Sequence, residues 1–89
     1  MGEQLTYNWI VVKGQRGYTA HCPEFMISVD AESSQTAKKE LAKEVAEFLR
    51  EALKDRQFLS IVEDGGFTKS DSGWLPPRME ESGTEKLEL

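Results

Sequence analysis

Hydrophobic and polar positions alternate along the first part of the chain, as is typical of β-strands. Residues 6–13 (TYNWIVVK) are rich in β-branched and aromatic side chains, the composition that favours strands. Because successive side chains of a strand point to opposite faces, Tyr7, Trp9 and Val11 are expected to share one face. Ile10 and Val12 are expected on the other. The pattern predicts a first strand over residues 6–13.

Two further strands are predicted after it. Residues 14–17 (GQRG) carry a glycine at each end, which suits a hairpin turn that needs positive φ. Residues 18–22 alternate again, and Pro23 ends this second strand because proline cannot donate a ladder hydrogen bond. A third strand is predicted over residues 26–30, with Ile27 and Val29 facing inward.

The clearest pattern is an amphipathic helix over residues 35–53. Its apolar positions recur at helical spacing and form one stripe, and Ser33 or Ser34 can cap its N-terminus through a hydroxyl. The stripe consists of Leu41, Val45, Phe48, Leu49, Ala52 and Leu53. The pattern therefore predicts a long helix packed on the sheet.

The chain after this helix carries two overlapping patterns. Phe58, Ile61 and Val62 match helical spacing and precede two glycines, so residues 55–64 are predicted as a second short helix. Leu59 and Ile61 also alternate, which leaves a strand open. A final short extended segment is expected near Trp74, with this side chain packing back on the core.

Together these elements predict an α+β domain. The expected architecture is a three-stranded antiparallel sheet, a long amphipathic helix, a short second helix and a final short strand. Residues 1–5 are expected to be a loose N-terminus, residues 6–77 a single domain, and residues 78–89 a disordered acidic tail. The predicted core consists of Trp9, Val11, Ile27, Val29, Leu41, Val45, Phe48, Leu49 and Trp74.

Charge and cysteine content narrow the function classes. The 89 residues carry a net charge of −5, which argues against a general nucleic-acid binder, since such proteins need Lys and Arg against phosphates. No apolar run approaches a membrane span and no secretory leader pattern is present, so a cytoplasmic location without membrane contact is expected. The single cysteine, Cys22, excludes an intrachain disulfide.

The candidate chemistry is sparse. His21 and Cys22 are adjacent in a strand, so their side chains point to opposite faces and cannot bind one metal ion or form a nucleophile–base pair within one chain. Glu24, Asp30 and Glu32 bracket the third strand and are the residues that a metal-dependent nuclease would use. Nothing in their spacing matches a metal geometry. No cofactor is predicted, and a small-molecule-binding dimer stays open as a further alternative.

Several features resemble the HicB-like antitoxin family. They are a second strand ending in Pro23-Glu24-Phe25, a short strand Ile27-Ser28-Val29, a polar turn, and a helix that opens at residues 33–37 (SSQTA). Residues 73–77 (GWLPP) are similar to the ending of stand-alone members. The resemblance covers roughly residues 6–77. This sequence departs from the family where Met26 and Ala31 stand near positions that usually hold glycine.

The resemblance implies a β-β-β-α-β domain, a pared-down ribonuclease-H-like topology that lacks the catalytic carboxylates. It also implies a non-enzymatic, protein-binding role, in which such domains often dimerise and cover a small basic RNA-cleaving toxin of the HicA type. No appended DNA-binding segment is expected after Pro77, so operator binding is not carried over. The expected partner interface is Glu24, Phe25 and Met26, together with a sheet edge.

Overall fold

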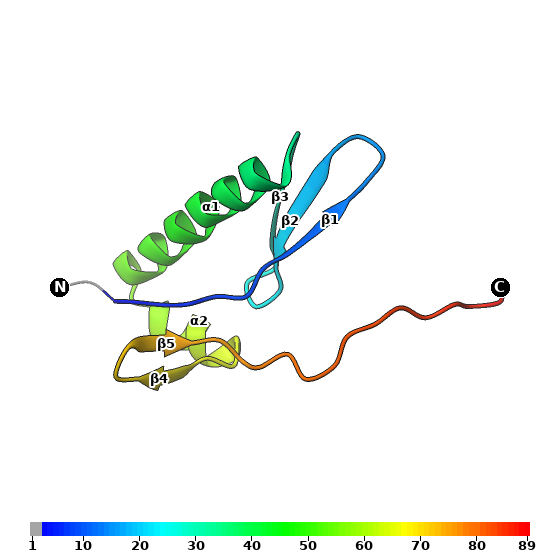
Figure 1. The fold of residues 1–89 in the computed structure, drawn as a ribbon. Helices are drawn as coiled ribbons and strands as arrows, with labels where there is room; N and C mark the ends of the chain where they lie inside the picture. Colours follow the sequence, from blue (N-terminus) through cyan, green and yellow to red (C-terminus); the bar gives the residue numbers. More distant parts are fainter. Residues whose placement is uncertain (1–2) are drawn as a thin grey trace.

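The computed structural model describes residues 3–89 and has the predicted α+β architecture. Three antiparallel strands, β1 (Ile10–Lys13), β2 (Tyr18–Cys22) and β3 (Ile27–Ala31), form a sheet in the order β1-β2-β3. The long helix α1 (Ser34–Lys54) covers one face of this sheet, chiefly over β2 and β3 (Figure 1). A short helix α2 (Phe58–Asp64) and a two-stranded sheet of β4 (Thr68–Ser70) and β5 (Gly73–Leu75) complete the fold.

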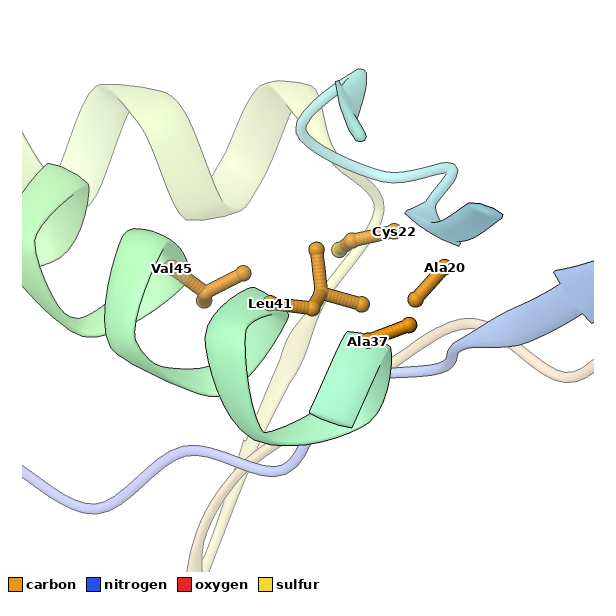
Figure 2. Close-up of a cluster of buried hydrophobic side chains, with 5 residues drawn as sticks. All are labelled: Ala20, Cys22, Ala37, Leu41 and Val45. Atoms are coloured by element: carbon orange, nitrogen blue, oxygen red, sulfur yellow. The ribbon is translucent and has the colours of Figure 1, made fainter. Parts of the chain in front are cut away.

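The main core lies between β2 and α1. Ala37, Leu41 and Val45 recur on one side of α1 and point toward Ala20 and Cys22 of β2 (Figure 2). All five side chains are buried. The small Ala20 and Cys22 let the helix approach the sheet closely, and the larger Leu41 fills the space between them. Val11, Ile27, Val29 and Leu49 are partly buried against this cluster, on the side that the sequence predicts.

A second core lies beneath the first. Ala52 at the end of α1, Phe58 and Val62 of α2, Phe67 and Trp74 are all buried in it. Tyr7, Phe25 and Leu49 pack against both cores and join them. The prediction that Trp74 packs back on the core is confirmed, with 9% of the residue exposed.

The N-terminal segment differs from its prediction. Residues 1–2 lie outside the described part of the chain, but Gln4, Leu5 and Thr6 run beside β5. Trp74 donates its N–H to the Gln4 carbonyl at 2.8 Å and accepts from the Thr6 N–H at 2.9 Å. The pairing requires glycine at position 73, because a Cβ there would meet the Gln4 carbonyl oxygen at 2.4 Å. Residues 3–5 are therefore held, although the sequence predicts a loose end.

This pairing explains why the first strand is shorter than predicted. Residues 6–9 leave β2 to reach β5, so the ladder with β2 begins at Ile10. Trp9, predicted in the core, is consequently 49% exposed, and its ring lies 4.9 Å from the ammonium group of Lys38 on α1. Phe48, also predicted in the core, is 37% exposed because it lies at the margin of the helix stripe.

Element boundaries differ by a few residues elsewhere. The third strand begins at Ile27 because Met26 has the left-handed φ of 56° and belongs to the turn. The second helix is a helix, as predicted, but it begins at Phe58 because Arg56, with φ 59°, separates it from α1. The final extended segment is a hairpin of two strands. Residues 76–89 form no helix or strand, and residues 78–89 lead away from the fold (Figure 1); the predicted disorder of residues 78–89 stays a prediction.

Candidate partner-binding surface

The turn between β2 and β3 carries the three residues predicted to meet a partner. Pro23 ends β2, and residues 23–26 reverse the chain before β3 begins. The three predicted residues differ in their surroundings. Glu24 and Phe25 are half-buried, whereas Met26 is 78% exposed.

Glu24 holds the turn against the N-terminal segment. Its carboxylate accepts hydrogen bonds from the Asn8 side-chain amide at 2.8 Å and from the Asn8 backbone N–H at 3.3 Å. The Cys22 thiol donates to the same carboxylate at 3.6 Å. The Asn8 amide also donates to the Pro77 carbonyl at 3.0 Å, so one asparagine joins three distant parts of the chain. Glu24 is thus a structural acceptor with its oxygens already bonded.

Phe25 fills the junction between the two cores. Its ring stacks on Phe67, with centroids 5.2 Å apart and planes 6° from parallel. The ring of Phe48 lies on it at 5.4 Å, tilted by 47°. Aromatic pairs with such centroid distances stabilise a fold by roughly 0.5–1.5 kcal/mol beyond their burial. Phe25 therefore makes the turn rigid rather than offering a free side chain.

Met26 is the side chain that the turn presents. Its left-handed backbone costs a non-glycine residue about 1–2 kcal/mol, and its exposed thioether makes no hydrogen bond. Met26 stands near a position where the resemblance expects a glycine, and its φ of 56° is one that glycine adopts more readily. A strained, exposed apolar residue on a rigid turn is a feature that the packing of this chain does not explain.

The turn adjoins an open sheet edge with acidic residues. β3 is an edge strand, since no strand pairs with its outer side in residues 3–89. Residues 23–35 include Glu24, Asp30 and Glu32 and no Lys or Arg. Asp30 accepts a hydrogen bond from Thr19 at 2.6 Å on the sheet face that α1 leaves open. The outer edge of β3 therefore presents unpaired backbone N–H and C=O groups beside carboxylate side chains.

These carboxylates do not form a metal site. Glu24 lies in the turn before β3, whereas Asp30 and Glu32 lie toward its other end, roughly 10–16 Å along the extended strand from Ile27. Within residues 3–89, no three His, Cys, Asp or Glu side chains lie close enough together to hold a metal ion. These three carboxylates therefore do not converge in the way that a metal-dependent nuclease would need.

His21 and Cys22 lie on opposite faces, as predicted. The His21 ring shares a hydrogen bond with the Ser28 hydroxyl across the strand pair, while Cys22 is buried under α1. Burial raises the pKa of the Cys22 thiol to about 11, and the nearby Glu24 carboxylate acts in the same direction. A thiol with this pKa is a weak nucleophile at neutral pH. Cys22 is a core residue.

A hollow of about 340 Å³ adjoins the turn between β1 and β2, where Arg16, Tyr18, Asp30 and Glu32 are among the residues that line it. A second hollow lies on the α1 side. It has a volume of about 230 Å³ and lies between the N-terminal segment and α1, where Leu5, Tyr7, Leu49 and Leu53 line it. Glu3 and Arg50 are the charged residues at this hollow. The volume of this second hollow is below the 300–1,000 Å³ usual for ligand pockets. None of the helices in residues 3–89 is long and apolar enough to cross a membrane.

Comparison with protein-family models, curated proteins and solved structures finds no match to this chain. The HicB-like resemblance therefore rests on the residues quoted for it.

Proposed function

We propose that this chain is a non-enzymatic protein-binding domain of the HicB-like kind. It binds a small basic RNA-cleaving protein through the Met26 turn and the adjoining edge of β3. The observation that carries the proposal is Met26, an exposed apolar side chain held in a left-handed conformation by a rigid turn. Strained backbone of this kind is concentrated at functional positions in proteins.

The surroundings of Met26 suit such a partner. An added strand can hydrogen-bond to the open side of β3, which gives affinity through the backbone. Asp30 and Glu32 lie along or just after this strand and outnumber Arg16, the one basic residue that lines the same hollow, so they favour a positively charged partner. Apolar contact at Met26 and charge along β3 would together set the orientation of the partner.

The test uses the product of a short basic reading frame, with a lone histidine, that neighbours the gene. The purified product should cleave RNA, and increasing amounts of this chain should suppress the cleavage. Met26→Asp should weaken the suppression about tenfold or more, the effect of removing an interface anchor. Leu59→Asp is the matched control, because Leu59 is also exposed but lies on α2.

Several results would overturn the proposal. They are the absence of such a neighbouring frame, cleavage that this chain leaves unchanged, and equal suppression by wild type and Met26→Asp. RNA cleavage by this chain alone, dependent on Mg²⁺ and lost on Asp30→Asn, would instead establish the nuclease alternative.

A further inference from the structure

The opposite edge of the same sheet, β1, has a different chemical character. The Gly14 N–H donates to the Gly17 carbonyl at 2.8 Å, so it points toward β2. Because the N–H groups of successive strand residues alternate in direction, those of Ile10 and Val12 also point toward β2. Those of Val11 and Lys13 then point away from the sheet. No strand of residues 3–89 pairs with this side of β1.

Apolar side chains follow this open edge. Trp9, Ile10 and Val12 are 49%, 42% and 55% exposed, and they lie within four consecutive positions. Natural proteins usually protect an edge strand with charges, proline or a bulge. Here Lys13 is the one charged residue between positions 9 and 13, and proline is absent from them. The edge is therefore open to strand pairing.

We propose that β1 pairs antiparallel with β1 of a second copy of this chain, with the two-fold axis at Val11. The two three-stranded sheets then form one six-stranded sheet. Val11 exchanges both of its outward backbone hydrogen bonds with Val11 of the second copy, since a hydrogen-bonded pair on a two-fold axis is self-complementary. This inference does not rest on the proposed function, which uses the edge of β3.

The register centred on Val11 gives favourable pairs at every position of the segment. Ile10 lies opposite Val12 of the second copy, which joins two exposed aliphatic side chains on the sheet face away from α1. Trp9 lies opposite Lys13 of the second copy on the other face. Directly opposed side chains have Cβ atoms about 5 Å apart, within the reach of a cation–π contact.

The rings near this edge already attract cations within one copy. Lys38 lies 4.9 Å from the centroid of Trp9, and Lys13 lies 5.8 Å from that of Tyr18. A register centred on Lys13 would instead place two ammonium groups against each other, which is destabilising. The Val11 register therefore uses the apolar residues of the edge and avoids the like-charge pair.

The pairing also accounts for Trp9. Its alternation with Tyr7 and Val11 is that of a core residue, yet half of it is exposed in the single chain. A second strand beside β1 would cover this side chain. Because the contact is short, we expect a weak dimer with a dissociation constant in roughly the micromolar range.

Sedimentation equilibrium over a range of concentrations tests the association. The wild-type chain should move from monomer to dimer, and Val12→Lys should stay monomeric over the same range. The matched control is Leu59→Lys, because Leu59 and Val12 are both 55% exposed. A wild-type chain that stays monomeric, forms larger assemblies, or dimerises equally well with Val12→Lys would overturn the proposal. Circular dichroism checks that each variant is folded.

Disulfide trapping tests the register. A hydrogen-bonded pair has Cα atoms about 5.5 Å apart, which a disulfide can bridge. Under mild oxidation, Val11→Cys should therefore give a covalent dimer, whereas Lys13→Cys should not, since Lys13 faces Trp9. Leu59→Cys controls for chance collision. Trapping by Lys13→Cys instead of Val11→Cys, or by neither variant, would overturn the Val11 register.

Discussion

The ring of Phe25 stacks on the ring of Phe67, with their centroids 5.2 Å apart and their planes 6° from parallel. Phe25 belongs to the turn before β3, and Phe67 precedes β4, so this contact joins the two cores of the domain. We expect Phe25→Ala and Phe67→Ala to be coupled by about 0.5–1.5 kcal/mol in a double-mutant cycle. Urea unfolding of the wild type and of the three variants measures the coupling. Strictly additive losses would show that the stack adds nothing beyond burial.

The unequal burial of the apolar side chains of α1 predicts that two substitutions lower the free energy of unfolding by different amounts. Leu41 is fully buried, so Leu41→Ala should lower the free energy of unfolding by about 3 kcal/mol. Phe48 is 37% exposed, and Phe48→Ala should cost about 1–2 kcal/mol, because water already reaches part of the ring. Equal costs in urea unfolding would contradict the placement of Phe48 at the margin.

The left-handed backbone at Met26 predicts a substitution that raises stability. Met26→Gly should increase the free energy of unfolding by about 0.5–1 kcal/mol, since the relief of strain exceeds the entropy cost of glycine. Arg56→Gly is the matched control, because Arg56 has a similar φ of 59°. Both variants should be more stable by thermal unfolding, but only Met26→Gly should weaken binding to the basic partner. Unchanged partner binding by Met26→Gly would remove Met26 from the interface.

The raised pKa of Cys22 predicts a dependence of stability on pH. The pKa is about 11 in the folded chain, against an ordinary value of 9.0. The unfolded thiol therefore loses its proton first, so this contribution to stability is complete below pH 9 and is lost as the pH rises toward 11. The difference in unfolding midpoint between wild type and Cys22→Ala should narrow or reverse across this window.

The same burial protects the thiol from reagents. At pH 8 an alkylating reagent should modify Cys22 only after urea is added. Fast modification of the folded chain would contradict the packing of Cys22 between β2 and α1.

Local patterns predicted the elements whose contacts are close in sequence. The apolar stripe of α1 repeats over several turns, so its type and length followed from spacing alone, and Ser33 caps it through a hydrogen bond to the Thr36 N–H. The β1–β2–β3 meander followed from alternation and from the turn residues between the strands. The break between α1 and α2 did not follow from local patterns, because amino-acid composition does not indicate that Arg56 adopts a left-handed backbone conformation.

Contacts between residues that are far apart in the chain could not be predicted from the sequence. Residues 6–9 and 10–13 have the same strand-forming composition, and only the position of β5 shows that they have different partners. Trp9 and Trp74 are chemically identical, but one is half exposed and the other is buried. At the candidate interface, the sequence located the turn between β2 and β3, and its role in partner binding stays a prediction. The different roles of Glu24, Phe25 and Met26 are visible only in the hydrogen bonds and ring contacts of the folded chain.

The pairing of the N-terminal segment with β5 has a consequence for how the chain folds. The indole N–H of Trp74 donates to the Glu3 carboxylate at 3.1 Å, across a separation of 71 residues. During synthesis the β1–β2–β3 meander and α1 can form while β5 is still in the ribosome, but the first residues must wait for their partner. The second core therefore closes only after β5 has been synthesised, and because Tyr7, Phe25 and Leu49 pack against both cores, we expect the two cores to unfold together.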